Sequence, residues 1–214
     1  MLSVFLLSRG EDGNPLACKA MKTRFDSGVR LQISLVENRF DMLDFVTKNA
    51  DGSFKPYIVK AREAIANSSP ESSVYIGCDS LRIKTSKSKT GWAIKYSQVI
   101  ILHVNSNNGG KLYHETAIIE DVTGKYGDKA ALRERLMGEV YRAVELVESI
   151  IDVIGDRRLE VHLDINSDPT QKSHAVVTEA LGYVKAMTGY DAIIKTPNGD
   201  SWASTHAADN LVRR

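Results

Sequence analysis

Four acidic residues stand in apolar or inward-facing parts of this chain, where a carboxylate is unusual. An ionised carboxylate that leaves water costs several kcal/mol unless it is paired or bound to a metal. Acids in such positions are therefore the first candidates for chemistry. They are Asp79 at the end of VYIGCD, Glu139 in ERLMGEV, Asp164 in LEVHLDI and Asp209 in WASTHAADNLVRR.

These acids predict a specific chemistry if the fold brings them together. Four converging carboxylates cannot all stay ionised without cations, and their hard oxygen atoms favour Mg²⁺ or Mn²⁺ over zinc. Such a group supports two-metal hydrolysis of a phosphodiester, in which one ion activates water and the other stabilises the leaving oxygen. We therefore expect Asp79, Glu139, Asp164 and Asp209 to be catalytic residues that bind two Mg²⁺ or Mn²⁺ ions.

Each acid taken alone has an ordinary explanation. An aspartate at a strand end is typical of a turn or a cap, which applies to Asp79 and Asp164. Glu139 would suit a helical ion pair with a neighbouring arginine, and Asp209 a surface position near the end of the chain. Only the joint placement of the four favours the metal site.

The elements that must position these acids follow from the spacing of apolar residues. Strands are predicted first at 74–79, 91–105 and 111–120, with the turn NNGG at 107–110 between the last two. Strands joined by a loop and a tight turn indicate an antiparallel meander.

Helices and strands alternate in the second half of the chain. We predict a helix over 126–154 capped by Asp128, followed by a strand over 159–165. A second helix is predicted over 170–187, with Asp168 as cap and Pro169 and Gln171 in its first turn. A strand over 191–195 and a last helix, from about Ser201 after the turn PNGD, complete the predicted elements. The order βββαβαβα predicts an α/β fold with one mixed five-stranded sheet flanked by helices.

This arrangement brings the acids toward one edge of the sheet. Ligands of such sheets gather at the carboxyl ends of the strands, where Asp79 and Asp164 are expected. Glu139 lies on the apolar stripe of its helix, while Glu134, Glu145 and Glu148 fall on the opposite, solvated face. By its spacing from Trp202 and His206, Asp209 is expected to point inward as well.

Residues 1–70 are predicted to form an N-terminal extension, and residues 71–214 the domain that carries the acids. Within the extension we expect a helix over 56–66, a possible strand over 29–36 and a mixed helical stretch near 40–48. Because residues 1–20 show no periodicity, Met21 could be the natural start.

Composition limits the classes of partner and compartment. The chain has 214 residues and a net charge of +1, so a nucleic-acid partner must be argued from local patches. Cys18 and Cys78 form no disulfide framework and no CxxC pair, which suits the cytoplasm. The apolar stretch in MLSVFLLSRG is too short for a signal peptide or a membrane span. We expect no membrane partner.

A basic segment follows Asp79 directly. Between Asp79 and Glu115 there is no acid, whereas RIKTSKSKT carries four bases, Arg82, Lys84, Lys87 and Lys89. A basic loop that starts at Ser80, next to the acids, would hold the phosphates of a nucleic acid. The alternative is an exposed hairpin loop that its lysines keep soluble.

The segments around the acids also resemble a known family. IGCDS, ERLMGEV, EVHLDI and the WAS…AD ending are similar to the ribonuclease H-like superfamily and, within it, to the YkuK-like family of predicted nucleases. The resemblance covers Tyr57 to Val212. It implies that Asp79, Glu139, Asp164 and Asp209 are the metal-binding acids. The sequence departs from the patterns of related enzymes in two places. Ribonuclease H has a histidine in a loop well before its last aspartate, whereas His206 is only three residues before Asp209. Leu81 stands where proofreading exonucleases have a glutamate.

Three further polar residues are assigned to the surroundings of the acids. His162, Ser80 and His206 are expected to support the acids or to act with them, although His162 also suits a hydrogen-bonded core position and His206 a packing role. GCDSL resembles an esterase motif, but Cys78 interrupts it and the Asp-x-x-His partner of such enzymes is missing.

The predicted function is metal-dependent hydrolysis of the RNA strand of RNA·DNA hybrids. The alternatives are a structure-specific, resolvase-like DNA nuclease and a catalytically silent module of the same fold that binds nucleic acid. The expected partner in every case is a nucleic acid, whether RNA·DNA hybrid, RNA or structured DNA.

Overall fold

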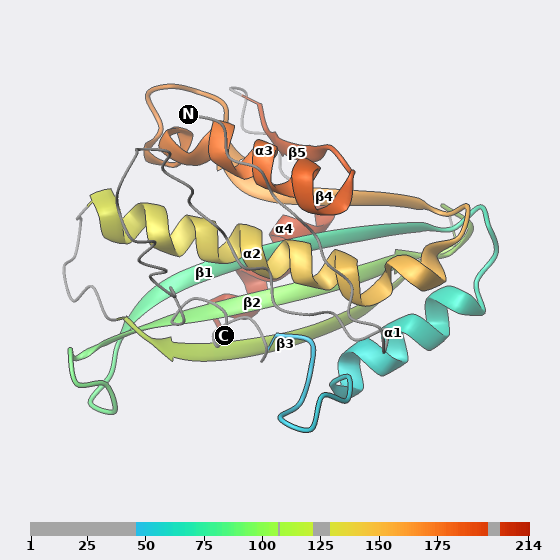
Figure 1. Cartoon of the computed structure of the whole chain (residues 1–214), viewed down its shortest axis with the longest axis horizontal. Helices are drawn as coiled ribbons and strands as arrows, with labels where there is room; N and C mark the ends of the chain where they lie inside the picture. Colours follow the sequence, from blue (N-terminus) through green and yellow to red (C-terminus); the bar gives the residue numbers. More distant parts are fainter. Residues whose placement is uncertain (1–45, 107, 122–128, 197–201) are drawn as a thin grey trace, which may run out of the picture. The chain divides into compact units, whose positions relative to one another are not determined.

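The computed structural model describes residues 46–106, 108–121, 129–196 and 202–214, which all belong to the compact unit Phe40–Arg214. Figure 1 shows the elements in chain order. They are α1 Pro56–Ala66, β1 Ser73–Lys84, β2 Trp92–His103, the 3₁₀ turn η1 Val104–Ser106, β3 Gly110–Glu120, α2 Lys129–Ile154, β4 Arg158–Asn166, the 3₁₀ turn η2 Lys172–Val176, α3 Val177–Thr188, β5 Ala192–Lys195 and α4 Ala203–Val212.

The five strands form one mixed sheet in the order β3-β2-β1-β4-β5. The pairs β1–β2 and β2–β3 are antiparallel, and the pairs β1–β4 and β4–β5 are parallel. The predicted α/β fold and mixed five-stranded sheet are therefore confirmed. β1 lies at the centre, where antiparallel pairing changes to parallel pairing.

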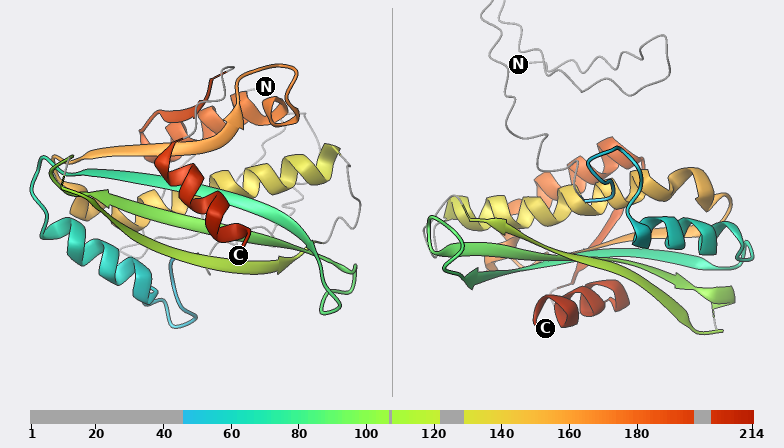
Figure 2. Two further views of the ribbon diagram at one scale, coloured as in Figure 1. Left: turned by 180° about the vertical axis from the view of Figure 1, so that it is seen from behind. Right: turned by 90° about the horizontal axis from the view of Figure 1, so that it is seen from below.

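Helices cover the two faces of the sheet unequally. α1, α2 and α3 lie on one face, and α4 lies on the other, against β1, β2 and β4 (Figure 2). The main core fills the space between the sheet and α2. Its buried members include Val74, Ile76, Ile100, Val161 and Leu163 from the strands and Leu136, Val140 and Val147 from α2. The face that carries α4 is the one on which Asp79 and Asp164 lie.

β1 extends beyond the predicted end at Asp79. Its antiparallel register with β2 continues from Asp79↔Ser97 to Lys84↔Trp92, so Ser80 does not begin a loop. Its parallel pairing with β4, by contrast, stops at Cys78↔Leu163. Asp79 is therefore the first residue beyond the parallel ladder but lies in the middle of the antiparallel one.

Two helix predictions need correction. The helix expected from Thr170 begins as an α-helix only at Val177, after the turn η2. Asp168 Oδ1 accepts the N–H of Thr170 at 2.9 Å and its backbone carbonyl accepts that of Gln171, so the aspartate closes a tight turn instead of capping a helix. Residues 46–48 of the stretch near 40–48 are not helical, since Lys48 forms an isolated bridge with Phe54.

Several sequence predictions fall outside the described residues. They concern the strand over 29–36, residues 40–45, Met21, the cap Asp128 and the turn at 197–200. The division of the chain at residue 70 stays a prediction. No helix in the described ranges is long and apolar enough to cross a membrane.

Glu145 does not lie on a solvated face, contrary to the prediction from the helical spacing of α2. The segment that begins at Val46 covers it, and Thr47 donates to Glu145 Oε1 from its backbone N–H at 3.0 Å and from its hydroxyl at 2.8 Å. Burial raises the pKa of Glu145 to about 7, although the bonds from Thr47 lower it. A helical projection could not show this, because the covering segment comes from another part of the chain.

Replacing Glu145 with Gln is expected to flatten the pH dependence of stability. The folded pKa of about 7 lies above the ordinary value of 4.5, so the folded protein binds the extra proton in this range. Its contribution to stability is full below pH 4.5 and is lost as the pH rises to 7, a change of about 1–3 kcal/mol. Urea unfolding between pH 5 and pH 8 measures it. Equal slopes for Glu145→Gln and wild type, with exposed Glu134→Gln as control, would contradict the prediction.

Candidate active site

Three of the four predicted acids lie on the side of the sheet that α4 covers. Successive strand residues point to opposite faces, which places Asp79 of β1 and Asp164 of β4 on this face. Asp209 reaches them from α4, and its carboxyl group is close enough to that of Asp79 to share a hydrogen bond. Asp79 is only 9% exposed.

Glu139 approaches from the opposite face, on α2. It is 3% exposed, and its Oε1 accepts the hydroxyl of Ser80 at 2.5 Å. Ser80 follows Asp79 directly, so Glu139 lies behind the same short stretch of β1. Burial raises the pKa of Glu139 well above its usual range; Arg135 lowers it, and the charges of Asp79 and Asp164 raise it further. Asp79 therefore interacts electrostatically with each of the other three acids.

Arg135 ties Glu139 to the backbone of β1. Its Nη1 donates to the Ser80 carbonyl oxygen at 2.7 Å, to the Ser80 hydroxyl at 2.5 Å and to Glu139 Oε1 at 3.3 Å. The predicted role of Ser80 as the start of a loop is thus wrong, because Ser80 is a buried residue that links β1 to α2. The alternative of an esterase with Ser80 as nucleophile also loses support, because the Ser80 hydroxyl donates its hydrogen bond to the Glu139 carboxylate.

Asp164 and Asp209 also have neighbouring cations. Lys195 of β5 forms an ion pair with Asp164, and Arg213 Nε lies 2.6 Å from Asp209 Oδ1. Asp79 accepts the backbone N–H of Ser80 at 2.7 Å. Burial nevertheless raises the pKa of Asp79 to about 6, and the neighbouring Asp164 and Asp209 add to the rise.

The donor set fits Mg²⁺ or Mn²⁺ in its chemistry. All four candidates offer hard carboxylate oxygens, and the close approach of Asp79 and Asp209 is the kind of like-charge contact that a cation relieves. In the arrangement described, however, no three His, Cys, Asp or Glu side chains of the described residues surround a common point that could hold a metal ion. Metal binding would require these side chains to turn.

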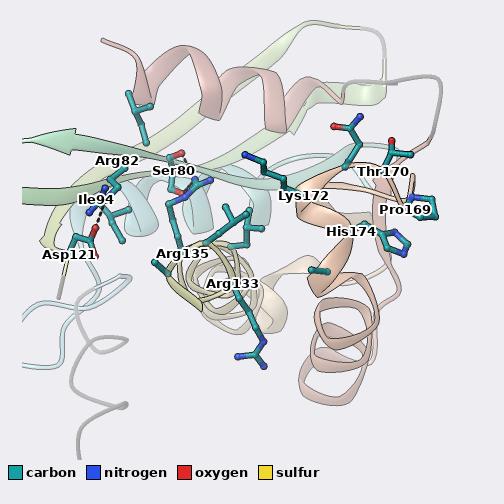
Figure 3. Close-up of a pocket in the computed structure, with 16 residues that line it drawn as sticks. Ser80, Arg82, Ile94, Asp121, Arg133, Arg135, Pro169, Thr170, Lys172 and His174 are labelled. Carbon is teal, nitrogen blue, oxygen red and sulfur yellow. Dashed lines mark hydrogen bonds and ion pairs between the residues drawn. The ribbon is translucent and has the colours of Figure 1, made fainter. Parts of the chain in front are cut away.

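A cavity of about 680 Å³ adjoins the Glu139 side of the site. Its walls come from the end of β1, the first turns of α2 and the segment after β4, and Figure 3 shows Arg135 turned toward Ser80 at one wall. The cavity is rich in basic side chains, namely Arg82, Arg133, Arg135, Lys172 and His174. Arg82, Arg133 and Arg135 are paired with Asp121, Glu179 and Glu139, so a phosphate group in the cavity would compete with these carboxylates.

The predicted basic loop divides into two parts. Arg82 and Lys84 belong to β1, and Arg82 pairs with Asp121 and lies over the ring of Trp92, 4.1 Å from its centroid. Lys84, Lys87 and Lys89 are exposed. The backbone N–H of Lys89 donates to Glu120 at 2.7 Å, which fastens the loop to β3.

The two histidines have different positions. His206 is exposed on α4, so the inward face predicted for Trp202, His206 and Asp209 is wrong for His206. The buried face of α4 consists of Ser204, Thr205, Ala208 and Val212. His162 is 2% exposed, as expected of a core histidine, and lies on the same strand face as Asp164.

Sequence reasoning indicated a neighbouring arginine for Glu139, and Arg135 fills that role. It missed the cationic partners of Asp209 and Asp164. Arg213 is four residues from Asp209, so helical spacing alone could have indicated it. Lys195 had no such signal. It meets Asp164 only because β5 pairs with β4.

Comparison with known proteins gives a match to a family model. The model described as ribonuclease H-like matches residues 58–213, from the first turn of α1 to the end of α4. No curated protein and no solved structure matches the chain.

Proposed function

The chain belongs to the ribonuclease H-like family, and from this premise we propose that it is a metal-dependent nuclease. The proposed reaction is two-metal hydrolysis of phosphodiester bonds, and the proposed substrate is the RNA strand of RNA·DNA hybrids. The observation that carries the proposal is the approach of Asp79, Asp164 and Asp209 on one face of the sheet. Membership of the YkuK-like family and a cytoplasmic location belong to the same proposal.

The carboxylates Asp79, Glu139, Asp164 and Asp209 would hold the ions. When bound, two such ions activate a water molecule and stabilise the leaving oxygen. The contribution of the chain itself is to hold the carboxylates in place. Arg135 and Ser80 orient Glu139, and the backbone N–H of Ser80 orients Asp79.

Basic side chains near the acids would hold the phosphates of the substrate. The exposed Lys84, Lys87 and Lys89 follow Asp79 along β1 and its loop. Arg133 and Lys172 line the cavity beside Ser80. Contacts of this kind set the register of a nucleic acid on the protein and carry no sequence information.

A catalytically silent module that binds nucleic acid is the second candidate. The pairing of Asp164 with Lys195 and of Asp209 with Arg213 favours it, because it neutralises these acids without metal ions. A resolvase-like nuclease would use the same acids on structured DNA.

Cleavage of labelled nucleic acids tests the proposal. Single strands, duplexes, RNA·DNA hybrids and four-way junctions are incubated with the protein in Mg²⁺ or Mn²⁺, with EDTA as control. We expect the RNA strand of the hybrid to be cut. Cleavage of junctions alone would favour the resolvase-like enzyme. Binding without any cleavage would identify the silent module.

Removal of Lys87 and Lys89 is expected to weaken binding equally for all sequences. Each lysine that neutralises a phosphate releases a counterion, so the slope of log K against log salt should fall by about 0.9 per lysine. Fluorescence anisotropy over a salt series measures this for the double alanine variant, with exposed Lys60→Ala on α1 as control. An unchanged slope would show that the lysines serve only the solubility of the loop.

A further inference from the structure

The first turn of α4 lies unusually close to the central strand. A Cβ atom added to Gly77 of β1 would lie 2.7 Å from the carbonyl carbon of Ser204 and 2.8 Å from its Cβ and carbonyl oxygen. Such distances mean that only a glycine lets α4 approach β1 here. Ser204 is fully buried by this contact.

A continuous polar connection, the Glu160–His162–Ser204 relay, runs through the same contact. His162 Nε2 lies 2.8 Å from Glu160 Oε2, and His162 Nδ1 lies 2.7 Å from the hydroxyl oxygen of Ser204. That hydroxyl is also 3.2 Å from the carbonyl oxygen of Ile76 on β1. Both ring nitrogens of His162 therefore have partners, one on β4 and one on α4.

Two aromatic rings stack on the imidazole of His162. The ring of Tyr75 stacks on His162 with centroids 5.5 Å apart, and Trp202 stacks with centroids 5.1 Å apart. Trp202 is the residue that precedes α4. The orientation of His162 is thus fixed by stacking, and the direction of its hydrogen bond to Ser204 is fixed with it.

A serine, a histidine and an acid in a row are also the components of a hydrolase triad, but this relay cannot serve as one. A nucleophilic hydroxyl must reach a substrate, whereas the hydroxyl of Ser204 lies under β1 with no exposed surface. The relay points at the helix α4 and not at solvent.

We propose that Ser204 and His162 are positioning residues that set the register and rotation of α4 on the sheet, and so place Asp209 against Asp79. The inference rests on the proposed function and deepens it. Apart from the relay, the buried face of α4 offers Thr205, Ala208 and Val212, whose packing against a sheet is not directional. A hydrogen bond to a fixed imidazole nitrogen is directional.

Register matters because Asp209 is far along the helix from its point of attachment. It lies five residues after Ser204, which corresponds to about 7.5 Å along the axis. A rotation of α4 by one residue, about 100°, would turn Asp209 away from Asp79. Ser204 and His162 are buried, so the relay can position Asp209 without touching the substrate.

Substitutions that divide the relay test this role. Ser204→Ala removes the hydroxyl. Thr205→Val is the matched control, because it also removes a hydroxyl but keeps the buried volume, and among the described residues the Thr205 hydroxyl bonds to the carbonyl of Trp202 in its own turn. His162→Asn retains an amide near Nδ1 and can still meet Ser204. His162→Gln places its amide near Nε2 and meets only Glu160.

The measurements are hydrogen exchange of the α4 amides, affinity for Mn²⁺ alone, and kcat and KM on the hybrid. We expect Ser204→Ala and His162→Gln to speed exchange in α4 but not in α3, to weaken Mn²⁺ binding by about 10–100-fold, and to lower kcat with little change in KM. His162→Asn should retain more Mn²⁺ affinity than His162→Gln. Thr205→Val should resemble wild type.

Three results would overturn the positioning role. The first is hydrogen exchange in α4 of Ser204→Ala that equals that of wild type. The second is faster exchange in α4 with unchanged Mn²⁺ affinity and kcat. The third is equal Mn²⁺ affinity of His162→Asn and His162→Gln. Exchange in α4 is measured without metal or substrate. If wild type neither binds Mn²⁺ nor cleaves, the proposed function has failed, whereas a failure of the relay alone leaves wild-type cleavage intact.

Discussion

Asp79→Asn is expected to abolish cleavage while making the protein more stable. If Asp79 binds the ions, its loss removes about 4 kcal/mol or more of transition-state stabilisation, a fall in kcat of about 10³-fold. The amide keeps the shape of the side chain but not its charge. Burial raises the pKa of Asp79 to about 6, so the charge that this carboxyl group carries at pH 7 is less stable in the fold than in the unfolded chain. Removing it should raise the free energy of unfolding by about 1–3 kcal/mol.

Two measurements on the same sample check this pair of effects. Cleavage of the hybrid in Mn²⁺ gives the activity, and urea unfolding at pH 7 without metal gives the stability. Asp191→Asn is the matched control, since the side chain of Asp191 is 84% exposed and should change neither quantity. Retained cleavage by Asp79→Asn would remove this residue from the site. Lost cleavage with lower stability would point to misfolding instead.

Gly77→Ala is expected to destabilise the protein strongly, although it adds only one methyl group to β1. The new Cβ would lie less than 3 Å from backbone atoms of Ser204, which no side-chain rotation can relieve. α4 would have to move as a whole, and the relay through His162 would be stretched. We expect a loss of about 2–4 kcal/mol of stability and, with Asp209 displaced, loss of cleavage.

The matched control for this substitution is Gly182→Ala in the interior of α3. A Cβ at Gly182 meets nothing within 4 Å, so alanine should stabilise the helix by up to about 1 kcal/mol. Thermal unfolding of the two variants beside wild type decides the matter. If Gly77→Ala unfolds at the wild-type temperature, α4 is less firmly seated on β1 than the contact distances indicate.

Much of the fold was predictable because the local sequence pattern of most elements agrees with the structure that they adopt. The helix over 56–66 has its predicted bounds, and each predicted strand corresponds to a strand of the sheet. The length of β1 was underestimated, because Arg82 and Lys84 look like loop residues. In the fold Arg82 pairs with Asp121 and lies on Trp92, which lets a charged residue continue the strand.

The candidate site was predictable where one element decides the position of a side chain. The apolar stripe of α2 correctly placed Glu139 inside. For α4 the same reasoning failed at His206, because β1 approaches the helix so closely at Gly77 that small residues such as Ser204 and Ala208 form the buried face. Contacts between elements, such as Lys195 with Asp164, have no pattern in the linear sequence.

The change in pairing along β1 gives its two halves different mechanical properties. Up to Cys78 the strand is paired with β2 on one side and β4 on the other, whereas from Asp79 onward, among the described strands, it is paired with β2 alone. The first half is stiff, and Asp79 follows it directly, so the doubly paired half anchors a carboxylate that must stay within about 0.5 Å of its working position. The second half is more compliant, and it carries Lys84 and leads to Lys87 and Lys89. One strand can thus keep its acid still while its basic arm adapts to the ligand that it meets.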